Sequence, residues 1–498
     1  MKKMEWGYGM FCLEKKTMKQ IRIIETLDEL TEPITAAELA KKIDYGTPPT
    51  VLGLVKEIKD IVEKNYNYEE LDLLINHKGI LLIRNSGNLN KLYDQLLALD
   101  LGYEIIKCLI LDKKLNTHNF CVAFGVSEST LKRKLKLLNH VVKTYNFHIT
   151  CSNKIGIKGS ELNFRIFSFI FLTSIHPQFK EINWVKKKSE YIELAKEIVD
   201  YLTGHFFYKQ LNESQVQTLA LWLYLTNLSE VKNKELVFSS EQVSIIRNIQ
   251  IIDKPECLSQ WSVSNWQFLL IGSYCFQLSD FPVREDLFGA MCLSNKYQLF
   301  GQSWIHIFQK NFTHLTQNER IHLKNQLLRI YVADIFMRVD QKVFPTLNYN
   351  NIFQLKERYP CYSMRFENFF GELSNQYPKL QIADFKVKFL RICLSLYPLE
   401  KAIATIKVFY FSGQYNNFDT TAKENLKIYF SNQYHLLFTA NSKDADVIIS
   451  TVDRETFTEE QLKRTILIRS PFLKKDLLNI DQALKKRQTV LLKGGSNR

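Results

Sequence analysis

The segment over residues 120–138, FCVAFGVSESTLKRKLKLL, has the residue types of a DNA-binding helix-turn-helix. Such a motif needs a small residue in its second helix, a glycine in the turn and a cap for the recognition helix. Ala123, Gly125 and Ser127 fill those places. Leucines at positions 131, 135 and 138 then mark the buried stripe of the recognition helix.

The opposite face of this recognition helix is rich in hydroxyl and cationic side chains. Residues near the start of such a helix reach base edges, whereas cations and the helix N-terminus hold phosphates. We expect Ser129, Lys132 and Arg133 to enter the groove. The other predicted contacts of this unit are Ser127, Thr130, Lys134, Lys136 and the wing residue Lys154. A solvated basic helix with no partner is the alternative.

The elements that must position these residues occur twice, in the order helix, helix, helix, strand, strand. In the first copy the helices are predicted over 18–30, 36–42 and 48–63, and the strands over 73–75 and 80–83. In the second copy they are predicted over 103–111, 116–124, 127–145, 147–151 and 155–158. Thr35 and Glu38 have capping-box spacing, and Thr47 is the expected cap of a helix with two prolines in its first turn.

Charge distinguishes the two copies. Residues 105–159 contain ten Lys or Arg against two acids, a net charge of +8, whereas residues 17–85 contain nine against twelve, a net charge of −3. Because counterion release scales with the phosphates neutralised, the second copy should dominate DNA affinity. The first copy either touches DNA through Thr50, Lys56, Lys59 and Lys78 or serves in packing or dimer contact.

The rest of the chain changes character at Pro398. Residues 165–398 have helical periodicity with many aromatic residues, which are typical of core packing, and predict two bundles of about 110 residues each. Beyond Pro398, strands are predicted over 404–411, 436–440, 447–452 and 466–468, and helices over 419–432 and 473–487. This alternation predicts a small, mostly parallel α/β domain.

Composition narrows the function classes. A length of 498 residues calls for roughly three to five domains, and the net charge of +14 favours a polyanionic partner. The sequence has no uninterrupted apolar run of transmembrane length, no secretory signal pattern, and nine scattered cysteines without a Cys-x-x-Cys pair. We therefore expect a cytoplasmic protein with reduced thiols, no membrane partner, no metal and no cofactor. It also lacks the phosphate-binding, zinc and nucleophile-elbow motifs of enzymes, so it is not expected to be one.

This order of parts resembles the Mga/AtxA regulators of Gram-positive bacteria. The resemblance covers nearly the whole chain and is carried by the Leu39-Ala40 helix-turn-helix, the segment over 125–131 and the short lead over 10–14. It implies a multidomain, mainly α chain. The implied domains are winged helix-turn-helix domains over 1–88 and 89–162, helical-bundle regulation domains of the sugar phosphotransferase system (PTS) over 163–284 and 285–398, and an EIIB-like α/β domain over 399–498.

The resemblance also implies a function. It points to a transcription regulator of a global or virulence type that binds double-stranded DNA more by shape and bendability than by base identity. It implies a homodimer or higher homo-oligomer through the C-terminal domain, and tuning through PTS phosphocarrier proteins that phosphorylate histidine. His205, His306 and His176 are the candidate acceptors, although a lone histidine here is also typical of plain packing.

Two alternatives belong to other classes. A phosphotransferase enzyme of the EIIB kind would carry a cysteine in the loop after the first strand, but no cysteine follows Cys393. The other alternative is a PTS-linked signalling or scaffold protein whose winged units bind proteins and not DNA. The charge of the second copy argues against it, and a salt-dependent DNA mobility shift separates the two hypotheses.

Overall fold

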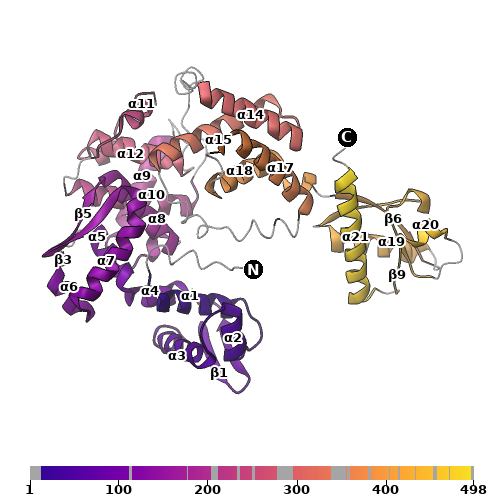
Figure 1. The fold of residues 1–498 in the computed structure, drawn as a ribbon, viewed down its shortest axis with the longest axis horizontal. Helices are drawn as coiled ribbons and strands as arrows, with labels where there is room; N and C mark the ends of the chain where they lie inside the picture. Colours follow the sequence, from indigo (N-terminus) through magenta and orange to yellow (C-terminus); the bar gives the residue numbers. More distant parts are fainter. Residues whose placement is uncertain are drawn as a thin grey trace. The chain divides into compact units, whose positions relative to one another are not determined.

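A computed structural model describes residues 13–111, 115–176, 178–203, 211–232, 236–248, 253–276, 295–337, 355, 359–378, 383–402, 404–412, 416–431, 433–452, 457–469 and 472–494. The chain divides into two compact units, which are described separately. Unit 1 comprises residues 1–298 and 325–348, and unit 2 comprises residues 299–324 and 349–498. Helices make up most of the described chain and the sheets are small (Figure 1), as expected for a multidomain, mainly α protein.

The first winged arrangement in unit 1 has the predicted order of elements. These are α1 (Lys15–Asp28), α2 (Ala36–Ile43), α3 (Pro48–Asn65), β1 (Leu71–Asn76) and β2 (Gly79–Arg84). The expected capping box starts α2, since Thr35 N–H donates to the Glu38 carboxylate at 3.0 Å and Glu38 N–H donates back to the Thr35 hydroxyl. The prediction that the Thr47 side chain caps α3 is wrong. Its hydroxyl lies 2.9 Å from the Thr50 hydroxyl and makes no cap bond to the backbone.

A helix that the residue pattern did not reveal, α4 (Asn90–Ala98), follows the first wing. It starts without a side-chain cap, so the usual sequence signal of a helix start is missing. Leu92 and Leu96 are buried in the core of the first winged arrangement, together with residues such as Ile23 and Val55. This core is separate from the larger one in the remainder of unit 1.

The second winged arrangement is built from α5 (Leu101–Ile110), β3 (Leu115–Asn116), α6 (Thr117–Phe124), α7 (Glu128–Val142), β4 (Phe147–Cys151) and β5 (Lys154–Gly159). Gly125 ends α6 in the left-handed region, with φ of 60°, which makes the turn that the motif requires. The three strands form an antiparallel sheet in the order β3-β5-β4. Strand β3 was not expected, because two residues are too short to show a strand pattern.

The second wing and the helices that follow it share one hydrophobic core. The helices are α8 (Glu161–Ile175), α9 (Lys188–Thr203), α10 (Glu213–Glu230), α11 (Ser240–Asn248), α12 (Val263–Cys275) and the later turns of α15 (Gln317–Phe336). The junction is aromatic. Phe147 of β4 packs edge-on against Phe164 and Phe167 of α8, with ring centroids 5.5 Å apart in both cases. Tyr145, which follows α7, packs against Phe167 at 5.2 Å.

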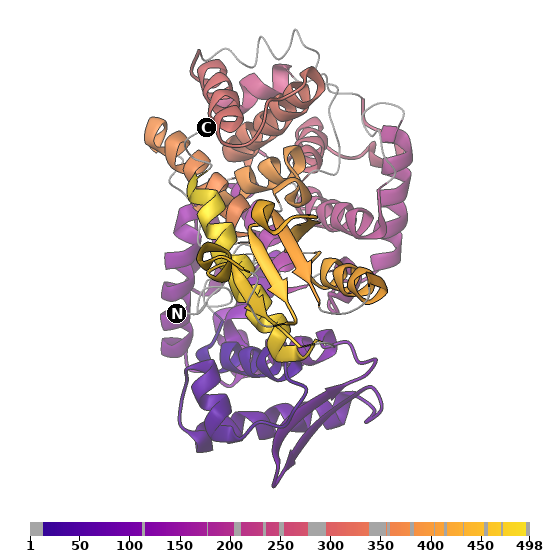
Figure 2. The ribbon, with the colours of Figure 1, turned by 90° about the vertical axis from the view of Figure 1, so that its right-hand side faces the viewer.

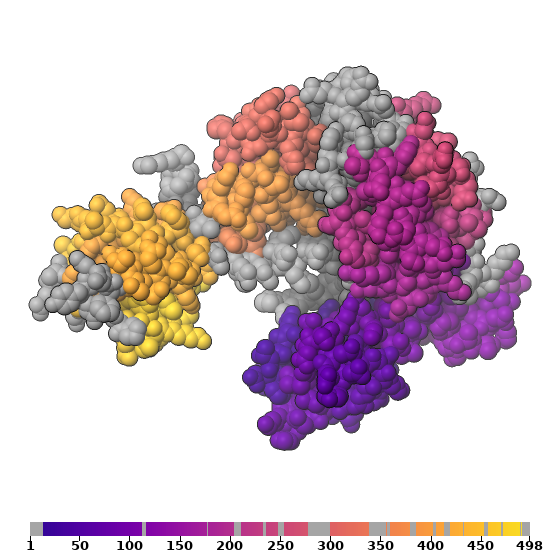
Figure 3. Space-filling view, turned by 180° about the vertical axis from the view of Figure 1, so that it is seen from behind, coloured from indigo at the N-terminus to yellow at the C-terminus, as the bar shows by residue number. Residues whose placement is uncertain are grey.

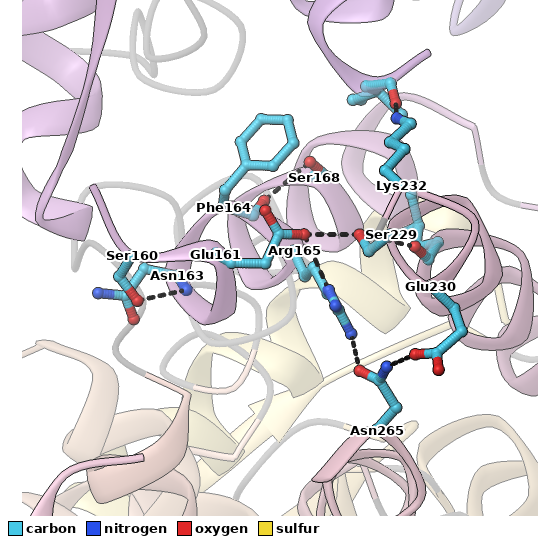
Figure 4. A network of polar contacts seen from close by, with 12 residues as sticks. Ser160, Glu161, Asn163, Phe164, Arg165, Ser168, Ser229, Glu230, Lys232 and Asn265 are labelled. Carbon is cyan, nitrogen blue, oxygen red and sulfur yellow. Dashed lines mark hydrogen bonds and ion pairs between the residues drawn. The ribbon is translucent and has the colours of Figure 1, made fainter. Parts of the chain in front are cut away.

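A buried polar network anchors the first turns of α8, immediately after the wing (Figure 4). The Arg165 side chain, 1% exposed, donates to Glu161 Oε1 at 3.0 Å and to Asn265 Oδ1 at 2.5 Å. Ser229 of α10 also donates to Glu161 Oε1, at 2.6 Å, and Asn265 of α12 donates to Glu230. The guanidinium charge is thus compensated where water cannot reach, and α8, α10 and α12 are tied together.

The helical part of unit 2 contains α14 (Asn295–Asn311), the first turns of α15, α17 (Pro360–Gln376) and α18 (Ala383–Leu396). Its core is built on aromatic side chains, as the sequence predicts. Trp304 is fully buried, stacks on Phe308 at 5.2 Å and packs edge-on against Phe369 at 4.8 Å. These contacts hold α14 against α17.

The C-terminal part of unit 2 is the expected parallel α/β structure (Figure 2). Its elements are β6 (Ala404–Phe411), α19 (Asn416–Phe430), β7 (Tyr434–Phe438), β8 (Val447–Ser450), α20 (Glu459–Leu462), β9 (Thr465–Leu467) and α21 (Lys474–Gly494). The strands run parallel in the order β7-β6-β8-β9, and the part forms one compact yellow-orange body in space-filling view (Figure 3).

Helices α19 and α21 cover the same face of this sheet. Leu426 of α19 and Leu484 of α21 share one core with Ile406, Val408 and Tyr410, which are alternate residues of β6. The intervening side chains point to the other face, which neither of these two helices covers. On that face Phe411, Leu437 and Leu467 are 37%, 45% and 40% exposed.

The shared core of the second wing and α8 makes a testable prediction. Replacing Phe167, 2% exposed, by alanine should lower the free energy of unfolding by about 3–5 kcal/mol because it leaves a cavity. Amide hydrogen exchange should then rise in α7 and β4 as well as in α8 and α10. The matched variant Ile58→Ala in α3 should raise exchange in the first winged arrangement alone. Unchanged exchange in α7 and β4 of Phe167→Ala would contradict a shared core.

Candidate nucleic-acid interface

The predicted recognition helix is α7, and its start is organised by Ser127. The Ser127 hydroxyl accepts from Thr130 N–H at 3.1 Å, which satisfies one of the free N–H groups of the first turn. The same hydroxyl lies 2.8 Å from the Ser129 hydroxyl and 2.9 Å from that of Thr130. The first turn therefore presents a cluster of three hydroxyl groups at a helix N-terminus, where backbone N–H groups favour an anion.

The buried and exposed faces of α7 divide as expected. Leu131, Leu135 and Leu138 are buried in the core, each 3% exposed or less. On the outer face Ser129, Lys132, Arg133 and Lys136 are exposed, while Thr130 and Lys134 are half-buried. The only acid of this helix, Glu128, lies 3.6 Å from the Lys132 ammonium, and both side chains are more than half exposed. An exposed pair of this kind is weak, so Lys132 stays available to DNA.

The wing adds a second set of cations. Lys154 is exposed at the start of β5, as predicted. The antiparallel register places His148 of β4 opposite Lys158 of β5, and both side chains are exposed while Ile149 and Ile155 point into the core. His148 and Lys158 were not among the predicted contacts. The alternation of apolar and polar residues along the two strands could have identified them.

Three of the four predicted contacts of the first copy lie on α3, and the fourth, Lys78, is exposed in the turn between β1 and β2. Thr50 and Lys56 are exposed, and Lys59 is half-buried with its ammonium 3.5 Å from Glu63. Glu57, on the same helix, pairs with Lys16 of α1 at 2.9 Å. Acids and bases thus alternate along α3, which contrasts with the almost purely basic outer face of α7.

His176, one of the candidate phosphate acceptors, is 5% exposed and belongs to a buried hydrogen-bond chain. An indole N–H can only donate, so Trp184 donates to the Tyr103 hydroxyl at 2.9 Å. The single proton of that hydroxyl is then directed to His176 Nε2, 2.8 Å away. Nε2 accepts, which leaves the proton of a neutral imidazole on Nδ1, 3.3 Å from Asp94 Oδ1.

Burial keeps this histidine neutral. It lowers the pKa of His176 to about 4, with a smaller effect of the same sign from the Lys188 ammonium. Burial also raises the pKa of Asp94 to about 6, helped by the nearby charge of Glu181. Both ring nitrogens of His176 are engaged and the ring is enclosed, so the fold does not present it to a phosphate donor. It joins α4, α5 and the end of α8.

The other two candidate histidines differ in position. His306 is exposed on α14. His205 lies outside the described residues. Within the described ranges no cysteine is joined in a disulfide, and no group of acidic, histidine and cysteine side chains is arranged to hold a metal ion. None of the helices in the described part of the chain is long and apolar enough to cross a membrane.

The segment that carries this interface matches a known family. Residues 85–172 match the model of the Mga helix-turn-helix domain, a span that contains α4 to α7, the second wing and most of α8. No curated protein matches the chain. The match and the basic recognition helix place the second winged arrangement in the class of DNA-binding regulator domains. They support membership of the Mga family in particular.

The chain through Tyr103 leads to a second prediction. Tyr103→Phe removes one hydroxyl and leaves the Trp184 indole N–H and His176 Nε2 without their partner in a buried site. The free energy of unfolding should fall by about 1–3 kcal/mol, measured by chemical denaturation at pH 7. Tyr68→Phe, at a tyrosine that is 76% exposed, should change it by less than about 0.5 kcal/mol. Equal stability of the Tyr103 and Tyr68 variants would contradict this hydrogen-bond chain.

Proposed function

We propose that this chain is a transcription regulator of the Mga/AtxA type, and not an enzyme, and that its second winged arrangement supplies most of its affinity for double-stranded DNA. The observation that carries the proposal is the outer face of α7. It presents Lys132, Arg133 and Lys136 beside a serine-capped N-terminus, within the segment that matches the Mga helix-turn-helix model. Such a regulator acts in the cytoplasm and needs no cofactor.

The geometry favours a recognition mode in which contacts with phosphate dominate. Lysines on both α7 and the wing point to solvent, and neutralising phosphates releases condensed counterions. Base-edge contacts are left to Ser129, Lys132 and Arg133 in the first turns of α7. Because few side chains are placed to contact base edges, discrimination between sequences should depend mainly on the shape and bendability of the duplex.

A charge-removal experiment tests this assignment. Because the two cations are assigned to base edges, Lys132→Ala/Arg133→Ala should weaken binding to duplex DNA about 10- to 100-fold at fixed salt and reduce discrimination between sequences. The control is Lys196→Ala/Lys310→Ala, which removes two exposed lysines from α9 and α14. Equal binding by the test variant and the wild type would move the contact to α3. If the wild-type protein does not bind DNA even at low salt, the alternative of a PTS-linked scaffold protein would be favoured.

For regulation, we propose that the helical parts of the two units act as PTS regulation domains. His306 supports this, because it is exposed on α14 and a phosphate on its ring would meet no buried surface. Phosphocarrier proteins of the PTS would be the donors. A phosphate adds negative charge and three acceptor oxygens, enough to shift an association equilibrium of modest free energy.

For assembly, we propose that the chain forms a homodimer or higher homo-oligomer through an EIIB-like C-terminal part. The parallel strand order supports the likeness, and the loop after β6 begins with Ser412 and lacks the cysteine of a transfer enzyme. The apolar side chains exposed on the sheet face opposite α19 and α21 support the assembly. Parallel sheets are normally covered on both faces, yet this face exposes Phe411, Leu437 and Leu467.

Substitutions on that face test the assembly. Phe411→Glu/Leu437→Glu should shift the chain to a smaller species in light scattering, because two charges would have to be buried in the contact. The control is Ile428→Glu, at a 72% exposed apolar residue of α19, the helix that covers the opposite face. An unchanged mass for the sheet variant, or an equal shift for the control, would contradict the assignment of this face.

A further inference from the structure

One edge of the second wing is closed by a side chain. In the sheet order β3-β5-β4, strand β4 has β5 on one side and, among the described residues, no strand on the other. Asn139 of α7 lies along that open side. Its Oδ1 accepts from Ile149 N–H at 2.6 Å, and its Nδ2 donates to the Ile149 carbonyl at 2.8 Å. A single side chain therefore satisfies both main-chain polar groups of one edge residue.

This contact requires an amide. A free strand edge presents one donor and one acceptor per outward-facing residue, and asparagine carries one acceptor oxygen and an NH₂ donor on the same planar group. The side chain is half-buried, and Ile149 itself is 4% exposed in the core. The bond pair thus fixes the middle of β4 to the last turn of α7, where water competes poorly for either partner.

This Asn139 clamp, the pair of bonds to Ile149, joins α7 to the wing, and both elements carry exposed cations. On α7 the exposed Lys132 and Arg133 lie toward the N-terminus from Asn139, and on the wing the exposed Lys154 and Lys158 lie on β5. We propose that Asn139 is a positioning residue for DNA binding, which holds the wing at the distance from α7 that lets both sets of cations contact one duplex. The inference rests on the proposed function, since it assumes that this unit binds DNA.

The wing is held elsewhere as well, so losing the clamp should loosen it without releasing it. At its tip, Thr117 N–H donates to the Asn153 carbonyl at 3.1 Å and the Thr117 hydroxyl donates to the Ser152 carbonyl at 2.7 Å. Ile149 and Ile155 remain in the core. Without Asn139 the middle of β4 loses its only described tie of this kind to α7, and the wing lysines lose their fixed position relative to the recognition helix.

The test compares the salt dependence of duplex binding for the full chain and four variants: Asn139→Ala, Asn139→Leu, Lys154→Ala/Lys158→Ala, and that pair combined with Asn139→Ala. The wing-lysine variant should lower the salt slope by about two phosphates. Asn139→Ala removes no charge, yet its slope should fall toward the same value, and the triple variant should match the wing-lysine variant. Asn139→Leu keeps the side-chain volume and should behave as alanine does, which covers a failure of Asn139→Ala to fold.

A purely structural role would give a different result. The control Ile198→Val, at a fully buried residue of α9, should lower the melting temperature and leave the slope at the wild-type value. If the Asn139 variants also melt earlier but keep the wild-type slope, the inference is overturned while the proposed function stands. If the wild type itself shows no salt-dependent DNA binding, the proposed function fails and the inference fails with it.

Discussion

The packing of α8 against the second wing is the contact on which the second winged arrangement and the helices of unit 1 depend. Phe164 and Phe167 meet Phe147 of β4 immediately after the chain leaves the wing, and the Arg165 network ties the same turns of α8 to α10 and α12. Each buried aromatic ring contributes several kcal/mol, so the wing and the helices cannot separate without losing a large part of the stability of the domain. The family match, which ends inside α8, includes this junction.

The two winged arrangements therefore belong to different hydrophobic cores. The first has a core of its own, and the second is part of the larger core that continues into the helices. The basic copy is thus the one that is joined rigidly to the helical part. If the helices receive a signal, as we propose, the recognition helix is the element that a shift of α8 would move.

The parts of this fold that were predictable from the sequence depend on interactions between neighbouring residues. The capping box at Thr35, the turn at Gly125 and the cap at Ser127 are set by neighbouring residues, and all three formed as expected. Parallel α/β structure followed from the alternation of strands and helices. The face of α7 was predictable as well, because three leucines at helical spacing fix which side is buried.

What the sequence could not predict depends on residues far apart in the chain. The burial of His176 follows from Tyr103, Asp94 and Trp184, which the fold brings together across about 90 positions or fewer. Helix α4 lacks a side-chain cap, and the role of Asn139 exists only because β4 is an edge strand. The sheet face that exposes Phe411 lacks both long helices because α19 and α21 pack on the same side, a choice that strand and helix lengths alone leave open.

The central claim is that the second winged arrangement is the DNA-binding surface, and hydrogen exchange of the full chain with and without duplex DNA tests it most directly. The account predicts protection in the first turns of α7 and in the wing over residues 152–158, with a smaller effect or none in α3. Protection confined to α3 and the first wing, or a DNA complex that leaves α7 and β5 exchanging as in the free protein, would contradict it.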